Sequence, residues 1–347
     1  MWSIRLSPAR PNFYNRHMRF RAFAAALGLA AATLGAPASA DEPAWEQWQH
    51  LPGVVDVGAR ADGTLVLMAA GRLYILSGGG ELSPFANGPD GFSADPNAEP
   101  YFVVAQPFLV DSAGCSWNAD DLLILDLTSP PGIARVDAAG HASRLASLPG
   151  VDTLGGIALD TTGSFGHRLL VTGTHNSNQT TVFAVDCQGG STTLTTSAPQ
   201  VEGGIAVAPA SFGQFAGNLI APDENTGQVW AIGPDGGVTL VAIPNLPTGG
   251  DTGVESAGFV PPGFGAGGFG YLADRGTPNN PFPGTDSLLR ISAETLAAAG
   301  VQEGDLLVST EGNGTTVGIR CADICSVFSA AQGTNGGHIE GHLLIIP

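Results

Sequence analysis

Two histidines flank a glutamate in the segment "GGHIEGHLLIIP", which spans residues 336 to 347. His338, Glu340 and His342 occupy alternate positions, and side chains two residues apart on a β-strand point to the same side. Such a trio can bind a metal ion or supply a general base beside a bound cation. The alternative is a histidine packed between two sheets for structural reasons. The H-x-E-x-H pattern on a strand is less specific than H-E-x-x-H on a helix, so both interpretations stay open.

Glu340 also belongs to a set of glutamates that begin similar apolar segments. These segments are "EGGIAV" at Glu202, "ESAGFV" at Glu255, "EGHLLI" at Glu340 and, more weakly, "EPYFVV" at Glu99. Carboxylates that converge in a low dielectric repel one another unless a cation neutralises them or some stay protonated. Oxygen ligands of this kind suit Ca²⁺, with Mg²⁺ as the second choice. We therefore expect these four glutamates to hold a divalent cation. The alternative is that they bond backbone amides or waters.

A second set of polar residues follows the next apolar strand of each such unit. Its members are His175, Asp223, Asp274 and Glu311, with Asp126 as a further candidate. Acidic residues are common at these places for turn reasons alone, because Asp accepts hydrogen bonds from local backbone donors. Asp274 is the candidate of interest, since the adjacent Arg275 could bind an anion beside a cation pocket. His342, His338 and Asp274 are thus the candidate catalytic residues.

The elements that must position these residues are short strands. Runs such as "TLVLMA", "RLLVTG" and "QVWAIG" recur along the chain, and nearly all are bounded by Gly, Pro, Asn or Asp. This pattern is typical of short antiparallel strands. Helical periodicity is convincing only in "SAETLAAAG", residues 292 to 300. The sequence therefore predicts an all-β fold.

The strands also repeat in order. Similar units begin at Leu154, Glu202 and Glu255, and a period of about fifty residues with four strands per unit indicates a β-propeller. The chain length predicts six four-stranded blades, closed by the C-terminal strand. We expect residues 54–86 to form the first blade. The last blade should contain four segments, residues 305–310, 315–321, 326–331 and 339–346. The loop 275–287 is interpreted as an inserted functional or capping loop.

The segment "GNLIAPDENTGQVWAIGPDGG", residues 217 to 237, resembles a unit of the NHL-repeat propellers. The chain as a whole resembles six-bladed propellers of the NHL, SMP-30/gluconolactonase-like and strictosidine-synthase-like groups. The resemblance to SMP-30-like enzymes implies a divalent metal at the starts of the inner strands. The pair Glu255-Ser256 is similar to the glutamate-serine opening of one such strand. The asparagine and aspartate ligands of those enzymes have no counterparts at the corresponding starts in this sequence.

The first forty residues have the features of a secretory signal peptide. Arginines precede the apolar stretch "AFAAALGLAAATLGA", and "ASA" ends at Ala40, as at a small-residue cleavage site. An uncleaved membrane anchor is the alternative. Residues 41–347 should then form a single propeller domain, secreted to the periplasm or the extracellular space, with no membrane association after cleavage.

Charge and cysteine content narrow the function further. The chain has no lysine, and beyond residue 40 its eight arginines face 31 acidic residues. This balance argues against a nucleic-acid partner and excludes a Schiff-base lysine. An even number of cysteines in an exported protein suggests disulfides. The close pair Cys321 and Cys325 is favoured, which leaves Cys115 with Cys187; a Cys-x₃-Cys metal site is the rival interpretation.

Two classes of function fit these features. The first is a Ca²⁺- or Mg²⁺-assisted hydrolase of a lactone or ester, in which His342 or His338 handles the proton. A metal-assisted lyase built from the same parts cannot be separated from it by sequence. The second is a non-catalytic propeller that binds a partner through its loops around a structural cation. In either case the expected partner is a small molecule or an extracellular ligand, and the expected state is a monomer.

Overall fold

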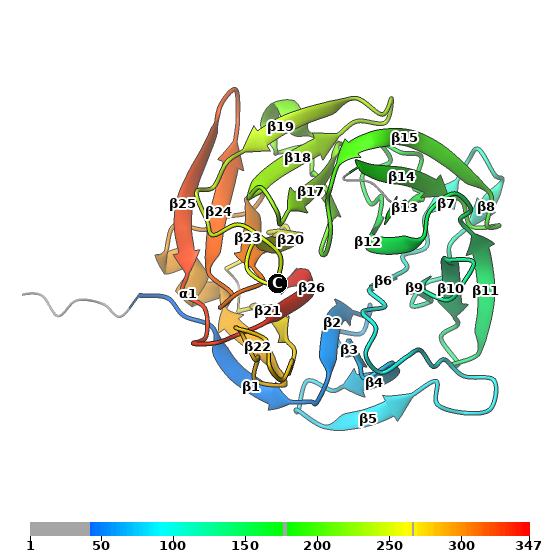
Figure 1. Cartoon of the computed structure of the whole chain (residues 1–347), viewed down its shortest axis with the longest axis horizontal. Coiled ribbons are helices and arrows are strands. Elements are labelled where there is room, and N and C mark those ends of the chain that lie inside the picture. Colours follow the sequence, from blue (N-terminus) through cyan, green and yellow to red (C-terminus); the bar gives the residue numbers. More distant parts are fainter. Residues whose placement is uncertain (1–41, 176–178, 266) are drawn as a thin grey trace, which may run out of the picture. The chain divides into compact units, whose positions relative to one another are not determined.

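The strands of this protein form six four-stranded antiparallel sheets in a computed structural model that describes residues 42–175, 179–265 and 267–347. The sheets stand as blades around a common axis (Figure 1). The all-β, six-bladed propeller predicted from the sequence is therefore confirmed. The predicted signal peptide lies outside the described residues. Within the described ranges no helix is long and apolar enough to cross a membrane.

The first four blades use strands in chain order, with the innermost strand first. Blade one contains β2 (Val54–Ala59), β3 (Leu65–Ala69), β4 (Arg72–Leu76) and β5 (Leu82–Phe85). Blade two contains β6 (Phe102–Val104), β9 (Leu122–Asp126), β10 (Gly132–Val136) and β11 (Ala142–Ser147). Blade three contains β12 (Thr153–Leu159), β13 (Leu169–Thr174), β14 (Gln179–Val185) and β15 (Ser191–Pro199). Blade four contains β16 (Ala206–Val207), β17 (Leu219–Asp223), β18 (Gln228–Ile232) and β19 (Val238–Ala242), with the 3₁₀ turn η1 (Gly213–Phe215) between its first two strands. The prediction for residues 54–86 as the first blade is confirmed.

The last two blades exchange strands, and here the sequence prediction is wrong. Blade five contains β20 (Val254–Phe259), β23 (Leu306–Thr310), β24 (Thr316–Cys321) and β25 (Cys325–Ala331). Blade six contains β26 (Ile339–Ile346), β21 (Phe269–Asp274), β22 (Ser287–Ser292) and β1 (Glu46–His50). After β20 the chain thus forms two strands and the helix α1 (Ala293–Ala298) before it returns to complete blade five. The sequence predicts that residues 339–346 share a sheet with the segments in 305–331, and this is wrong because the apolar pattern marks strands without marking their pairing.

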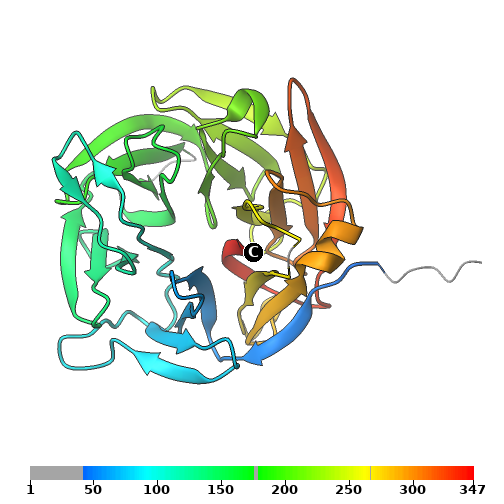
Figure 2. The same cartoon turned by 180° about the vertical axis from the view of Figure 1, so that it is seen from behind.

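Blade six closes the ring by combining the two ends of the described chain. Its innermost strand is the C-terminal β26 and its outermost strand is β1, which pairs with β22 (Figure 2). The Trp45 indole is buried and donates a hydrogen bond of 2.8 Å to Thr316 Oγ1 in blade five. The predicted closure by the C-terminal strand is confirmed, whereas the contribution of β1 was not foreseen.

The middle strands explain the continuous apolar runs in the sequence. All five residues of β3, β17 and β23 are buried, because each blade packs on both faces against its neighbours. One hydrophobic cluster, for example, joins Leu123 and Ile133 of blade two to Ile157 and Val171 of blade three. The core is therefore a ring of inter-blade layers, and it holds the starts of the inner strands at one end of the propeller axis.

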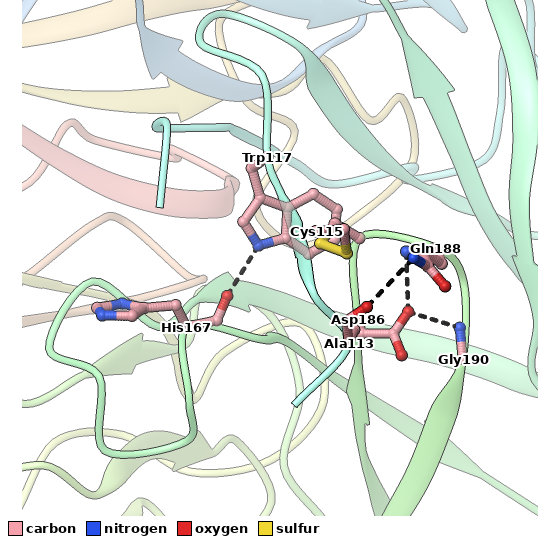
Figure 3. The surroundings of a disulfide bond; sticks show 8 residues. Ala113, Cys115, Trp117, His167, Asp186, Gln188 and Gly190 are labelled. Carbon is pink, nitrogen blue, oxygen red and sulfur yellow. Dashed lines mark hydrogen bonds between the residues drawn. A yellow bond between two sulfur atoms is a disulfide. The ribbon is translucent and has the colours of Figure 1, made fainter. Parts of the chain in front are cut away.

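Both predicted disulfides are formed, Cys115–Cys187 and Cys321–Cys325. The first joins the small hairpin β7 (Leu109–Val110) and β8 (Cys115–Ser116), which lies between β6 and β9, to blade three (Figure 3). Nearby, Trp117 Nε1 donates to the carbonyl of His167 at 2.8 Å. These contacts fix a long blade-two connection against the next blade. The rival Cys-x₃-Cys metal site is thereby excluded.

Candidate functional site

The four predicted glutamates line one cavity of about 440 Å³. Glu99 precedes β6, Glu202 precedes β16, and Glu255 and Glu340 are the second residues of β20 and β26. The remaining lining comes from loops at the same ends of the blades: Tyr101, Glu224, Gly250, Asp251, Arg275, Thr277, Glu311 and His338. The repeated position recognised in the sequence therefore corresponds to one place in space, where inner strands from four blades begin.

Glu255 and Glu340 are brought together by one tyrosine. The Tyr101 hydroxyl lies 2.6 Å from Glu340 Oε2 and 3.1 Å from Glu255 Oε1, and both glutamates are buried. A hydroxyl has a single proton to donate. The two contacts are both satisfied when Tyr101 donates to Glu340, the nearer carboxylate, and a protonated Glu255 donates to the Tyr101 oxygen.

Arg275 enters the cavity from the start of the loop after β21. Its guanidinium pairs with Glu99, lies 3.5 Å from Glu340 Oε1 and donates to the carbonyl of Asn97 at 2.8 Å. The loop 275–287 therefore does contribute to the cavity, as expected for a functional insertion. Glu99 has a cationic partner of its own, whereas no hydrogen bond or ion pair is formed by the Glu202 side chain within the described residues.

His338 connects two carboxylates on the other side of Glu340. Its Nε2 lies 3.2 Å from Glu311 Oε1 and 3.2 Å from Glu340 Oε1. His338 is buried, and its Nδ1 atom has no hydrogen-bond partner. One oxygen of Asp251, one of Glu311 and a ring nitrogen of His338 all lie within 4.8 Å of one another, a spacing that could hold a metal ion.

The cavity carries a large excess of acidic groups. Seven carboxyl side chains and a single arginine line it. Burial and the neighbouring Glu340 raise the pKa of Glu99 to about 7 and that of Glu311 to about 10. Burial and Glu224 raise the pKa of Glu202 to about 7. Burial, followed by the charge of Glu340, holds the pKa of Glu255 well above its usual value. Without a cation, several of these groups therefore keep their protons at neutral pH.

His342 does not join the cavity, although it lies only two residues after Glu340. Its Nδ1 contacts Asp56 Oδ1 at 3.0 Å, and its Nε2 lies 2.7 Å from the carbonyl oxygen of Ile157. The expected alternation fails because Gly341 adopts φ +65° and the pairing of β26 with β21 shifts register there. Such a bulge redirects the following side chain.

Asp274 also lies away from the cavity lining. It is fully buried and accepts hydrogen bonds from Thr285 Oγ1 at 2.6 Å and from the His338 backbone N–H at 2.8 Å. This carboxylate therefore orients the chain that carries His338. The turn interpretation holds for Asp223, which accepts from Thr226, while His175 is paired with Asp152 on the surface.

Several cavity residues were not singled out from the sequence. Tyr101 lies two positions after Glu99, Glu224 follows Asp223, and Asp251 sits in a Gly-rich loop before β20. Tyr101 and Glu224 could have been found only through the predicted residues beside them, and the sequence around Asp251 contains no comparable signal. Glu311 was noted as a member of the second set, and the structure brings it beside the first set through His338.

No protein-family model matches this chain, and no curated protein sequence does. Its fold is similar to that of a streptogramin B lyase, with 13% identity, coverage of 86% of this chain and 90% of that one, and a TM-score of 0.48. A gluconolactonase from Xanthomonas campestris is 16% identical, with coverage of 69% and 71% and a TM-score of 0.40. A calcium-binding regucalcin from Agrobacterium tumefaciens is 14% identical, with coverage of 68% and 74% and a TM-score of 0.40. At these identities the similarity concerns the fold only.

Proposed function

We propose that the acidic cavity binds a divalent cation, and that the protein uses it to hydrolyse a small ester or lactone. The observation that carries this proposal is the shared contact of Glu255 and Glu340 with the Tyr101 hydroxyl. It places two buried carboxylates beside one hydroxyl group, and Glu202 lines the same cavity. Glu202, Glu255 and Glu340 are not among the described residues whose ligand atoms lie within 4.8 Å of one another, so a cation would have to draw these carboxylates together. A cation there would offset the burial and the neighbouring negative charges that raise the pKa values of Glu202 and Glu255.

The donor set fits a hard cation. Glu202, Glu255 and Glu340 offer only carboxylate oxygens, which favour Ca²⁺ and, with tighter geometry, Mg²⁺. Glu99 is paired with Arg275, so its role would be to hold the arginine rather than to bind the ion directly. The cavity is predominantly polar, because all of its lining residues except Gly250 carry a polar or charged group.

Within the described residues, Asp251, Glu311 and His338 form the one group of three donors in this cavity whose ligand atoms already lie within 4.8 Å of one another. It includes an imidazole nitrogen, which suits transition metals better than Ca²⁺. Competition between Ca²⁺ and Mn²⁺ in variants of Glu255 and His338 separates the two sets. Loss of Ca²⁺ binding in Glu255→Gln supports the carboxylate set, whereas loss only in His338→Ala supports the histidine set.

A bound divalent cation would polarise the carbonyl group of the substrate and acidify a bound water. The chain itself supplies groups that can move protons at the same place. His338 Nε2 lies between Glu311 and Glu340, and in the cation-free protein burial and the neighbouring Glu340 raise the pKa of Glu311 to about 10, so that this carboxyl carries a proton there. Glu311 is therefore suited to donate a proton to the leaving oxygen, and His338 to accept one from the attacking water. Arg275 can stabilise negative charge on the substrate.

We also propose that the protein acts outside the cytoplasm, as a monomer on a small extracellular molecule. The two disulfides support this location, since such bonds persist in oxidising compartments. The signal peptide expected in residues 1–40 supports it from the sequence. The strong acidic excess is consistent with the expected absence of a nucleic-acid partner.

The test is a screen of purified protein against esters and lactones, with Ca²⁺ and with EDTA. We expect turnover that EDTA abolishes and added Ca²⁺ restores, and loss of turnover in His338→Ala. The matched control is His141→Ala, because His141 is an exposed histidine paired with Asp137 at a turn. Ca²⁺ binding without turnover would instead support a non-catalytic propeller with a structural cation.

A further inference from the structure

Asp56 is a fully buried carboxylate on β2 that lies next to the cavity without lining it. Three backbone N–H groups donate to it. They belong to Val57 at 2.9 Å, Phe102 at 2.8 Å and His342 at 2.9 Å. These donors come from the inner strands of blades one, two and six. Asp56 therefore connects three blades at the propeller axis.

The His342 ring completes this arrangement. Its Nδ1 lies 3.0 Å and 3.1 Å from the two oxygens of Asp56, and its Nε2 lies 2.7 Å from the carbonyl oxygen of Ile157 on blade three. Both ring nitrogens of His342 therefore face oxygen atoms. The ring thus contacts a buried carboxylate on one side and a blade-three carbonyl on the other, and it extends the connection to a fourth blade.

The backbone at Gly341 is shaped to this carboxylate. Gly341 has φ +65°, and a Cβ atom there would lie 2.5 Å from the carbonyl oxygen of Val55 and 2.6 Å from Asp56 Oδ1. A residue other than glycine would be strained in this conformation and would collide with Asp56. The bulge between Glu340 and His342 therefore packs directly against the Asp56 carboxylate.

Asp56 contacts the chain beside two residues of the candidate site, Tyr101 and Glu340. Phe102, whose N–H donates to Asp56, directly follows Tyr101. His342 lies two residues after Glu340, across the bulge. Tyr101 and Glu340 are the pair joined by the 2.6 Å hydrogen bond in the cavity. One carboxylate thus holds the backbone next to each partner of that bond.

We propose that Asp56, together with His342, is a positioning residue that fixes Tyr101 against Glu340 and so sets the geometry of the cation site. The inference rests on the proposed function, because cation binding is the property that Asp56 would influence. Groups behind the ligands of a metal site typically contribute tenfold to a hundredfold in affinity by orienting those ligands. A purely structural Asp56 would stabilise the fold and leave the affinity unchanged.

The test compares Asp56→Asn with Asp160→Asn. Asp160 is an equally buried aspartate that accepts from the backbone N–H groups of Phe165 at 2.7 Å and His167 at 2.9 Å, and it does not line the cavity. Both variants should lower the melting temperature. Calorimetric titration with CaCl₂ should show about tenfold weaker binding for Asp56→Asn and unchanged binding for Asp160→Asn. Equal affinity of Asp56→Asn and the unmodified protein would overturn the proposal.

A readout without metal separates this inference from the proposed function. The hydroxyl proton of Tyr101, assigned in NMR spectra by its loss in Tyr101→Phe, reports the bond to Glu340 directly. It should shift or broaden in Asp56→Asn and stay unchanged in Asp160→Asn. If the signal shifts although no protein binds Ca²⁺, the positioning role stands and the proposed cation function fails. An unchanged signal refutes the positioning role.

His342→Gln provides a second variant in case Asp56→Asn does not fold. Glutamine can keep one of the two ring contacts but not both, so this change is milder and should give the same shift of the Tyr101 signal. Failure of both variants to fold, under conditions in which Asp160→Asn folds, would contradict the proposal, because the pair would then serve global stability.

Discussion

Tyr101 and Glu340 are 239 positions apart in the chain, yet the tyrosine hydroxyl donates a hydrogen bond of 2.6 Å to the carboxylate. Tyr101 precedes the inner strand of blade two and Glu340 belongs to the inner strand of blade six. The bond therefore joins blades two and six, which flank blade one, and it depends on the closure of the ring by β26. It links the stability of the closed ring to the arrangement of the candidate site.

Removing this hydroxyl should weaken the closed ring. We expect Tyr101→Phe to lower the free energy of unfolding by about 2 kcal/mol, because a buried hydrogen bond to a charged group is lost. Urea unfolding in the presence of EDTA measures the change. Tyr74→Phe is the control, since the Tyr74 hydroxyl makes no hydrogen bond within the described part of the chain; equal stability of the two variants would argue against the 2.6 Å contact.

The cation-free protein should lose stability as the pH rises. The pKa of Glu202 is raised from 4.5 to about 7, so the folded protein retains a proton that the unfolded chain releases above about pH 4.5. This stabilising contribution is complete below that pH and is lost by about pH 7; Glu311, with a pKa of about 10, extends the loss upward. In EDTA the melting temperature should fall by on the order of 5 °C between about pH 5 and pH 8.

Ca²⁺ should reverse this trend. Above about pH 7 the Glu202 carboxyl is ionised, so the affinity for the cation should rise through that range, and binding to the folded state alone raises the melting temperature. The same thermal scans with excess CaCl₂ measure the effect. A melting temperature that falls equally with and without CaCl₂ would show that no cation offsets the repulsion.

Arg275 should compete with the cation for the same negative charge. It pairs with Glu99 and lies 3.5 Å from Glu340, so Arg275→Gln removes positive charge from the cavity. We expect about tenfold tighter Ca²⁺ binding, together with lower stability in EDTA. Arg290→Gln removes an arginine that pairs with Glu46 and lies over the Trp48 and Phe269 rings outside the cavity, and it should leave the Ca²⁺ affinity unchanged. Weaker binding by Arg275→Gln would mean that the arginine orients the ligands instead of opposing the ion.

The C-terminal strand should be essential for folding. Deletion of residues 338–347 removes β26, which is the innermost strand of blade six and pairs with β21. It also removes Glu340 and the His342 contact to Asp56. We expect loss of the near-ultraviolet circular dichroism signal and of cooperative thermal unfolding. A truncated protein that unfolds cooperatively would contradict the assignment of β26 as the closing strand.

The sequence predicted the propeller and the carboxylate ring because both follow from repetition. Glu202, Glu255 and Glu340 lie at the start of equivalent strands. Because equivalent positions of a repeat lie at the same end of the propeller, all three glutamates are expected to lie around the same opening. The structure departs from the prediction where the repeat is broken. The bulge at Gly341 turns His342 toward Asp56, and strand periodicity alone carries no signal for such a bulge.

The exchange of strands between blades five and six has a similar cause. The segment 269–274 has the same apolar pattern as any middle strand, and the pattern does not state whether it pairs with β20 or with β26. Asp56 had no distinguishing pattern either, because its role depends on Phe102 and His342, which lie far away in the sequence. Contacts between residues of different blades are the part of this site that cannot be predicted from the sequence repeat.

Calorimetric titration of CaCl₂ at about pH 8 tests the central claim most directly. The unmodified protein and Glu46→Gln, which changes a glutamate on the exposed rim, should bind one Ca²⁺ with equal affinity. Glu255→Gln should bind at least about tenfold more weakly, since a buried carboxylate of the cavity is lost. Equal binding by Glu255→Gln and the unmodified protein, or no binding by either, would contradict the account.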